Sequence, residues 1–513
     1  MNRHTCATFA LLTTLALAGS AWGDEREDLE VVRQTTVNLI QALVEKGVLT
    51  QDAAQAMIKQ AEDAARKKVA AAQAAQDKDK VVRVPYVPEM VKREIRDQIK
   101  QEVLAQAKTE RWGDVNAVPE WVDRMHWEGD LRMRYQRDSY AKNNAPPTFV
   151  DQWYGQAIGT TGNTTDSRER WRLRARLGLS AKISDMVSGT IRLATGSDNT
   201  PLSTNQTLGN TADKYSIWVD EAYLKLDPAK WFTVSGGRIP NPWFSTNLVW
   251  HNDLTFEGVA AKTTYHFDDR RSAYFTAGVF PLQDIAPNAG TKAKSKWLVG
   301  LQGGVDLVAQ SGSKAKFGLA LYDYKNVEGI PDTAAGLLDY DATKPQFHQK
   351  GNTTFPDPYA PHNPKLASKF RELNLTGQLD IANFAPTHVI LTADYVRNIG
   401  FDQAEIAKRT GYIVDKQNAG FQLQMTVGRP KIAARGDWQA FVGYRHLQAD
   451  AVLDAFTDSD FHLGGTDTKG YFIGGSYGLD KNTWLSLRWL SADSIYGPPL
   501  GIDVLQLDLN AKF

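Results

Sequence analysis

The sequence is almost without cysteine, and it has no long run of apolar residues after its first segment. Its one thiol, Cys6, lies near the start, so the rest of the chain offers no pair of cysteines for a disulfide. No later stretch has the roughly 20 consecutive apolar residues of a transmembrane helix. An excess of one charge is lacking too, because 59 basic residues balance 59 acidic ones. This balance argues against a nucleic-acid-binding protein.

Sequence motifs of enzymes are also lacking. The nine histidines are dispersed without the spacing of metal ligands, and no glycine-rich phosphate-binding motif is found. His251 and Asp253 are close in sequence, but no nucleophile motif accompanies them. We therefore expect no catalytic residue, no metal site and no cofactor.

The first segment has the pattern of a leader for export. A basic start precedes an apolar run from Ala7 to Ala18, and Ala21-Trp22-Gly23 fits a small-x-small cleavage site. We predict a Sec-type signal peptide over residues 1–23. Cys6 precedes the apolar run, so it is not placed as a lipoprotein acceptor. The mature chain would then have no thiol, which suits an oxidising periplasm.

Residues 24–118 have the period of a helix. Apolar residues recur there every three or four positions, namely Leu29, Val32, Leu39, Leu43, Val91, Ile95, Ile99 and Val103. We predict a periplasmic α-helical segment over this range. Two forms of it stay open, a coiled coil and a solvated arm.

Near His126 the period changes to two, which is the period of a β-strand. In residues 126–136, Trp127 and Leu131 alternate with charged side chains. The alternation recurs in residues 168–183, 188–196, 314–324, 371–380, 387–396, 420–428, 437–445, 482–490 and 503–513. We count about sixteen strands. Residues 216–226 fit no single register, because Asp220 or its apolar neighbours would lie on an unexpected face.

The links between these strands alternate in length. Long polar links such as residues 138–166 and 325–369 alternate with short ones such as 227–230. This alternation is typical of an up-and-down barrel with long loops outside and short turns in the periplasm. We predict an all-β fold for residues 119–513, a transmembrane antiparallel barrel of about sixteen strands. A soluble β-sandwich is the alternative, but it would need Greek-key crossovers.

The stretch RERWRLRARLGLSAKI, residues 168–183, decides where the barrel's charges face. One arginine on the lipid face costs about 2–4 kcal/mol at the midplane. Several would exceed the roughly 5–15 kcal/mol that stabilise an ordinary domain. We therefore predict a basic pore lining made of Arg132, Arg134, Arg170, Arg172, Arg174, Arg176 and Arg192.

A lumen lined by one sign of charge concentrates counter-ions, so the arginines predict some preference for anions. The alternative is a neutral wall, in which the arginines pair with lumen carboxylates such as Glu128, Asp130 or Glu372.

Two further segments have predicted roles. The loop over residues 240–253 combines prolines with aromatic residues, and we predict a constriction loop with Trp243, Phe244, Trp250, His251 and Asp253. The alternative places this loop on the rim or against a neighbouring subunit. In the last strand we predict a lipid-facing set of Leu505, Leu507, Leu509 and Phe513.

Residues 83–114, 119–138 and 236–260 resemble the putative porin family of Gram-negative outer membranes. The resemblance implies passive diffusion of small hydrophilic solutes and no catalytic motif. The aromatic end of the last strand, Phe513, resembles the signal that the barrel-assembly machinery recognises. The expected partners are outer-membrane lipid, this machinery, two further copies in a homotrimer and, through the helical segment, peptidoglycan.

Two other functions stay open beside passive diffusion. An outer-membrane barrel with long loops could be a surface receptor or adhesin, but the basic lumen would then have no role. A barrel enzyme built from a few dispersed side chains is the less favoured alternative. Detectable conductance would separate the channel from both.

Overall fold

The structure, a computed structural model, describes residues 124–513 except for residues 158, 289 and 362–363. The chain divides into two units, Met1–Pro119 and Glu120–Phe513. The predicted signal peptide and the predicted helical segment lie outside the described residues. No helix among the described residues is long and apolar enough to cross a membrane.

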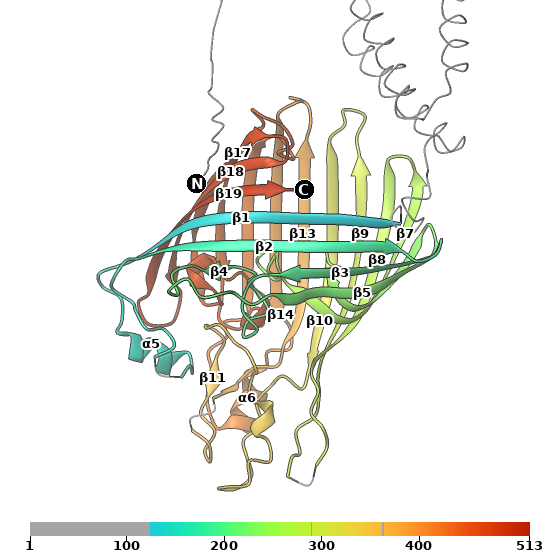
Figure 1. The fold of residues 1–513 in the computed structure, drawn as a ribbon. Coiled ribbons are helices and arrows are strands. Elements are labelled where there is room, and N and C mark those ends of the chain that lie inside the picture. Colours follow the sequence, from blue (N-terminus) through green and yellow to red (C-terminus); the bar gives the residue numbers. More distant parts are fainter. Residues whose placement is uncertain (1–123, 158, 289, 362–363) are drawn as a thin grey trace, which may run out of the picture. The chain divides into compact units, whose positions relative to one another are not determined.

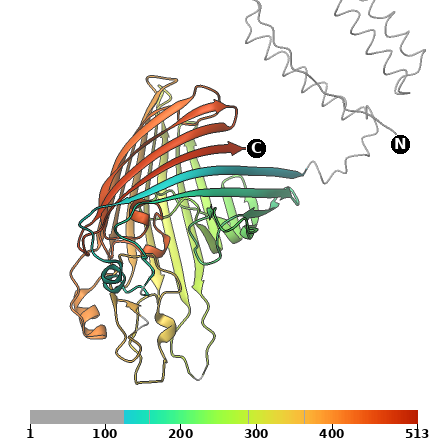
Figure 2. The ribbon, with the colours of Figure 1, turned by 60° about the vertical axis from the view of Figure 1, so that its left-hand side comes forward.

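One antiparallel sheet closes on itself to form a barrel (Figures 1 and 2). Each long strand pairs with its neighbours in sequence, and β1 closes the ring by pairing with both β2 and β19. The sixteen long strands of the described residues are β1 (Met125–Tyr140), β2 (Arg168–Lys182), β3 (Val187–Ala194), β5 (Trp218–Ala229), β6 (Phe232–Pro240), β7 (Thr255–Asp268), β8 (Arg271–Gln283), β9 (Lys296–Val308), β10 (Lys314–Lys325), β13 (Arg371–Ile381), β14 (His388–Asn398), β15 (Ala419–Gly428), β16 (Trp438–Leu447), β17 (Thr468–Asp480), β18 (Thr483–Ser494) and β19 (Gly501–Lys512). The predicted sixteen-strand barrel is confirmed.

The remaining elements of the described residues belong to the links between long strands. They are β4 (Gln206–Thr207), which pairs with β2, the two-stranded sheet of β11 (Thr354–Phe355) and β12 (Lys365–Leu366), the helices α5 (Pro147–Trp153) and α6 (Gln403–Thr410), and the 3-10 turns η2 (Asp341–Thr343), η3 (Asp454–Phe456) and η4 (Phe461–Leu463). Helix α6 begins where the Asp402 carboxylate accepts two backbone hydrogen bonds, and it ends at Gly411 with φ 80°.

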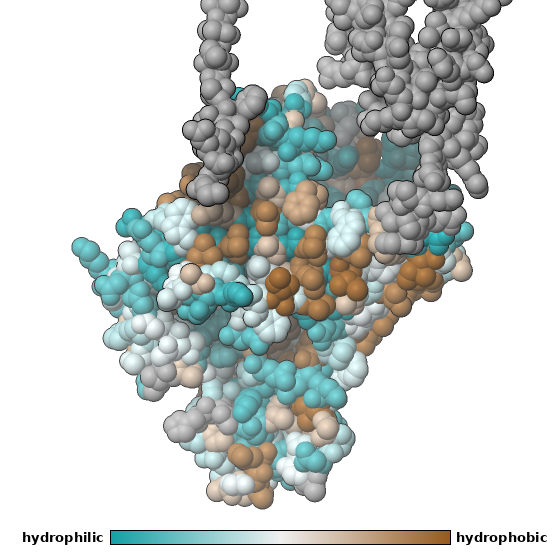
Figure 3. Space-filling model, in the orientation of Figure 1, coloured by the Kyte–Doolittle hydropathy of each residue, from teal (hydrophilic) through white to brown (hydrophobic). Residues whose placement is uncertain are grey.

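The strands alternate between the outer face and the interior, as the period of two predicts. On β1, Trp127 and Leu131 are 57% and 47% exposed, whereas Arg134 and Gln136 are 2% and 1% exposed. Apolar side chains outside and polar ones inside are the pattern of an outer-membrane barrel. In Figure 3, hydrophobic side chains gather over the region of β1–β5, and the loop end below them is mostly hydrophilic.

Long and short links lie at opposite ends of the barrel. Long links, such as residues 141–167 and 326–370, lie at the end where Figure 1 labels α5, α6 and β11. Short turns, such as residues 269–270 and 481–482, lie at the other end. The start of β1 and the end of β19 share that second end, because Asp130 pairs with Lys512.

Strand β5 contains a bulge that explains why residues 216–226 fit no single register. Arg192 on β3 pairs with Glu221, and the next residue pairs with Val219, so Asp220 is the extra residue. Both acidic side chains are buried, at 7% for Asp220 and 3% for Glu221. A bulge lets two consecutive side chains face the interior, which strict alternation forbids.

Candidate permeation site

Seven predicted arginines lie side by side on β1, β2 and β3. We call this set the arginine wall: Arg132, Arg134, Arg170, Arg172, Arg174, Arg176 and Arg192. In the register of β1 and β2, Arg132 lies opposite Arg174, and Arg134 lies opposite Arg172. Like charges directly opposite each other destabilise a sheet, so the wall depends on what its guanidinium groups bind.

Five arginines of the wall bind strand carboxylates. Asp130 accepts from Arg174 at 2.8 Å and from Arg176 at 2.7 Å. The other strand pairs are Arg134 with Asp508 at 2.7 Å, Arg170 with Asp138 at 2.7 Å, and Arg192 with Asp220 at 2.8 Å and Glu221 at 2.6 Å. Charge-assisted bonds of this kind are short and strong. Much of the wall is therefore neutralised.

Of the three carboxylates named as pairing candidates in the sequence, Asp130 is the one with an arginine partner among the described residues. Glu372 is fully buried and accepts a hydrogen bond from the backbone amide of Leu453 at 2.9 Å. Its place next to a backbone amide depends on loop packing, which the strand period does not predict.

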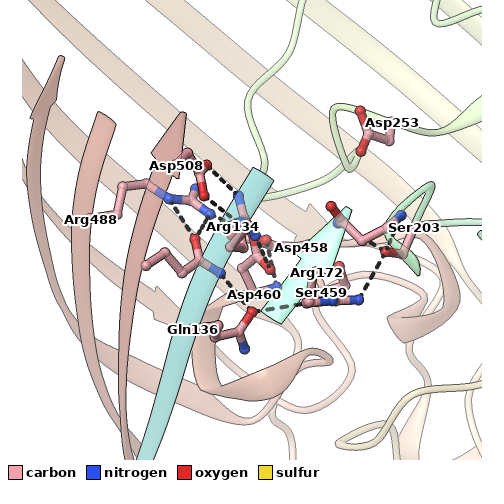
Figure 4. Close-up of polar contacts among 12 residues, drawn as sticks. Arg134, Gln136, Arg172, Ser203, Asp253, Asp458, Ser459, Asp460, Arg488 and Asp508 are labelled. Carbon is pink, nitrogen blue, oxygen red and sulfur yellow. Dashed lines mark hydrogen bonds and ion pairs between the residues drawn. The ribbon is translucent and has the colours of Figure 1, made fainter. Parts of the chain in front are cut away.

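Two arginines of the wall bind neutral oxygens instead. Arg132 donates to Oδ1 of Asn205 at 2.5 Å. Arg172 donates to Gln136 and Ser203, each at 3.4 Å, and Figure 4 shows it between these two side chains. Within the described residues, neither guanidinium forms an ion pair with a carboxylate. The Nε atom of each is buried without a hydrogen-bond partner in the described part of the chain.

The loop over residues 448–467 adds aspartates that face the arginines. Asp460 forms ion pairs with Arg134, at 3.3 Å, and with Arg488 of β18 (Figure 4). Asp458 binds Arg445 of β16 at 3.1 Å. Burial raises the pKa of Asp460, but the guanidinium groups outweigh it and hold that pKa well below its usual range.

Sequence reasoning missed these four residues of the site. Arg445 and Arg488 occupy polar positions of alternating strands, so the period could have identified them. Asp458 and Asp460 lie in a loop, where no period predicts the direction of a side chain.

The predicted constriction loop lies inside the barrel. Trp243 and Trp250 are 6% and 1% exposed, and their rings lie 5.2 and 5.0 Å from the ring of Tyr322 on β10. The backbone of Phe244 is bound on both sides by the amide of Gln302 at 2.8 Å. This loop packs against five inward residues of the barrel strands. We name this set the aromatic wall, and its members are Phe256, Phe280, Leu298, Tyr322 and Tyr324.

The other side of this loop reaches the arginine wall. Asp253 forms ion pairs with Arg174 at 3.2 Å and with Arg176 at 3.3 Å. Burial raises the pKa of Asp253, but the two guanidinium groups outweigh it and lower the pKa to about 2. His251 contacts the hydroxyl of Ser459 at 3.1 Å. The loop thus spans the interior from one wall to the other.

Two cavities lie along the arginine wall, and the outer one is lined in part by the link between β1 and β2. The outer cavity, of about 420 Å³, has an excess of basic groups in its lining, since Arg168, Arg170, Arg172 and Lys350 occur there with Asp138 and Asp460. The ammonium of Lys350 donates to the carbonyls of His462 and Gly464, and burial lowers its pKa to about 7. The inner cavity, of about 250 Å³, is balanced, since Arg132, Arg134, Arg174 and Arg488 face Asp253, Asp458, Asp460 and Asp508. Asp460 lines both cavities. A larger space of about 800 Å³ lies beside Leu282, Phe347 and Phe456, away from the arginine wall.

The last strand places its two sets of side chains as the period of two predicts. Leu507 and Leu509 are each 45% exposed and Phe513 is 65% exposed, and Leu505 is partly exposed. Between them, Gln506 and Asp508 are 1% and 7% exposed. Among the described residues, no group of three or more His, Cys, Asp or Glu side chains is placed to hold a metal ion.

Solved structures with a similar fold include three bacterial proteins. The outer membrane channel DcaP of Acinetobacter baumannii is 13% identical, with a TM-score of 0.40 over 76% of this chain and 97% of that one. OprB of Pseudomonas putida is 11% identical, with a TM-score of 0.45 over 78% and 97%. OmpF of Salmonella typhi is 13% identical, with a TM-score of 0.41 over 76% and 97%.

The family assignment rests on sequence. A comparison with curated proteins found no match. The model of the family described as "Putative porin" matches residues 33–513, which is most of the chain. The chain therefore belongs to the putative porin family.

Proposed function

We propose that this protein is an outer-membrane channel for passive diffusion of small hydrophilic solutes, with a moderate preference for anions. Membership of the porin family and the closed barrel support a channel rather than an enzyme. The observation that carries the anion preference is the pair of wall arginines, Arg132 and Arg172, that bind neutral oxygens.

The solute path runs along the arginine wall in this proposal. On the opposite side, the constriction loop packs its tryptophans against the aromatic wall. Spaces of about 180 and 800 Å³ lie beside that packing and away from the arginine wall. Along the arginine wall, the two cavities lie between polar side chains that water can solvate. In this proposal, a hydrated solute passes through the two cavities and contacts the arginines that line them.

The charges of the two cavities support a preference that is moderate. Without Lys350, the outer cavity still has three arginines and two aspartates in its lining, and this excess raises the local concentration of anions. The inner cavity is balanced, so its lining does not exclude cations. Arg132 and Arg172 supply positive charge that is hydrogen-bonded to neutral oxygens and not held in an ion pair within the described residues.

The experiment is planar-bilayer recording of the refolded mature chain in a KCl gradient. The proposal expects stepwise conductance and a reversal potential shifted towards that of chloride. Arg172→Gln should reduce the shift, and Arg137→Gln should not, because Arg137 is an outward residue that binds Glu169 outside the lumen. A reversal potential at zero or towards potassium contradicts the anion preference. A folded barrel without conductance contradicts the channel and favours a receptor or adhesin.

The remaining parts of the proposal concern assembly. The outward apolar side chains would contact outer-membrane lipid. The barrel-assembly machinery would recognise the last strand, which ends in Phe513. A homotrimer is proposed from the family resemblance, and a peptidoglycan contact is proposed from the predicted periplasmic helical segment. The division into residues 1–23, 24–118 and 119–513 also stays a prediction. Unheated gel electrophoresis of the native protein tests the trimer.

A further inference from the structure

A short extended segment, residues 203–205, faces the arginine wall from the link between β3 and β5. Ser203 and Asn205 both point to the wall, where they accept from Arg172 and Arg132. Thr204 lies between them and donates to Asp253 of the constriction loop at 3.3 Å. This alternation is that of an extended strand. The segment thus contacts the wall and the constriction loop at once.

Four contacts hold the segment in place. β4, which follows it directly, pairs with β2, so that Gln206 lies opposite Leu173. The hydroxyl of Thr195 donates to the carbonyl of Thr204 at 2.9 Å. The side-chain amide of Asn205 donates to Ser203 at 3.2 Å. Gly196 has φ 131°, and a Cβ there would lie 2.8 Å from the Ser203 carbonyl, so glycine permits this close approach.

The two side chains orient guanidinium groups without neutralising them. A carboxylate in the same place would add a negative charge, as Asp130 does for Arg174 and Arg176. An amide or hydroxyl oxygen supplies the hydrogen bond alone. Ser203 and Arg172 line the outer cavity, whereas Asn205 and Arg132 line the inner one. Each cavity therefore contains one oriented guanidinium that forms no ion pair with a carboxylate of the described residues.

We propose that Ser203 and Asn205 determine the charge selectivity of the channel. Each positions one arginine as a subsite for a small anion, such as chloride or a carboxylate, and the two subsites lie in series along the path. This inference rests on the proposed function, because it assigns the anion preference to two neutral positioning residues.

The test installs a carboxylate at each position. We expect Asn205→Asp and Ser203→Asp each to lower the anion-to-cation permeability ratio about threefold or more, because the new charge lies within bonding distance of a guanidinium. The matched control is Asn210→Asp, which adds the same charge to an exposed position of the same link. It should leave the ratio unchanged. Reversal potentials in a KCl gradient give all ratios, and a heat-modifiability gel confirms folding.

Chemical modification of an introduced cysteine tests the same proposal if an aspartate variant does not fold. The sequence has no cysteine after Cys6, so Asn205→Cys supplies a single thiol in the mature chain. A negatively charged methanethiosulfonate should lower the permeability ratio, and a neutral reagent of the same size should not.

The failures of the two proposals are distinguishable. An anion-selective wild type whose ratio is the same in Asn205→Asp, Ser203→Asp and Asn210→Asp overturns the assignment and leaves the proposed function in place. A wild-type channel without anion preference overturns both.

Discussion

The arginine wall and the aromatic wall occupy opposite sides of one barrel, and they differ in what fills the space before them. Tyr322 and Trp250, where the constriction loop meets the aromatic wall, are 0% and 1% exposed, as in the core of a soluble protein. On the arginine wall, the Arg170 and Arg176 side chains keep 18% and 19% of their surface exposed. The same alternating strands thus support a packed apolar core on one side and, on the other, a charged surface whose side chains are 3% exposed at Arg134 and 19% exposed at Arg176.

The difference follows from what each set of side chains requires. Buried aromatic rings gain from edge-to-face packing, and the loop tryptophans supply it at ring distances near 5 Å. Guanidinium groups lose their hydration when buried, so they remain stable where carboxylates or water surround them. The constriction loop contacts both sets of side chains. Its Trp250 packs against Tyr322, and its Asp253 forms an ion pair with Arg174.

Removing the Trp250 side chain, which is buried between the constriction loop and the aromatic wall, should have the largest effect on stability. Trp250→Ala is expected to cost about 3–5 kcal/mol of the free energy of unfolding, because it leaves a large cavity in the aromatic packing. Trp171→Ala is the control, since this outward ring is 51% exposed and should cost clearly less. Urea titration of the barrel in lipid vesicles measures both. Equal losses would contradict a core inside the barrel.

A buried carboxyl in the loop over residues 448–467 should make stability depend on pH. Burial raises the pKa of Asp450 to about 7, above its usual value near 4. Between about pH 4 and 7 the folded state keeps a proton that the unfolded chain releases. The free energy of unfolding should therefore fall as the pH rises through this window.

Asp450→Asn tests this sign, because it removes the titration and keeps the shape. Relative to the wild type, the variant should gain stability between pH 4 and pH 7 in thermal unfolding. Asp213→Asn, at an exposed position, should show no such gain. A gain that shrinks as the pH rises would contradict the raised pKa.

Substitution of two glycines on β9 should have a smaller effect on the free energy of unfolding. The two positions lie on the same strand and differ in the space around an added Cβ. A Cβ at Gly300 would lie 2.5 Å from the ring of Trp243, whereas at Gly303 the nearest atom is 4.0 Å away, on Phe275. Gly300→Ala should cost about 1–3 kcal/mol through overpacking. Gly303→Ala should be nearly neutral. Unfolding in vesicles compares them, and a neutral Gly300→Ala would contradict the close packing of the loop.

Selectivity should respond to charges on the arginine side and not on the other. Asp460→Asn removes the negative charge that Arg134 and Arg488 share, so the anion-to-cation permeability ratio should rise about threefold. Asp394→Asn removes a carboxylate that binds Thr246 of the constriction loop, at the other side. It should leave the ratio unchanged. Reversal potentials that shift equally in both variants would contradict a path along the arginine wall.

The barrel could be predicted from the sequence because its signal is periodic. Alternation over residues 126–136 and 503–513, repeated along the chain, specifies both faces of each strand, and link lengths specify the topology. The period failed at Asp220, where a bulge inserts one residue. Boundaries of long links were also predictable, since polar and proline-rich residues interrupt the alternation.

The partners of the arginines could not be predicted in the same way. Asp253 and Asp460 reach the wall from loops, and their places depend on tertiary packing such as that of Trp250 and Phe461. Asn205 and Ser203 resemble ordinary loop residues in the sequence. The predicted anion preference therefore depends on contacts between distant segments, which a linear pattern does not contain.

The central claim is that solutes pass along the arginine wall and not between the constriction loop and the aromatic wall. Single cysteines test it, since the chain has no cysteine after Cys6. One is Ser486→Cys, in the lining of the inner cavity, and the other is Thr276→Cys on β8, at an inward position that is 1% exposed. Both channels are recorded while a charged methanethiosulfonate is added. The account predicts a fall in conductance for Ser486→Cys and no change for Thr276→Cys. A fall for Thr276→Cys, with none for Ser486→Cys, would contradict it.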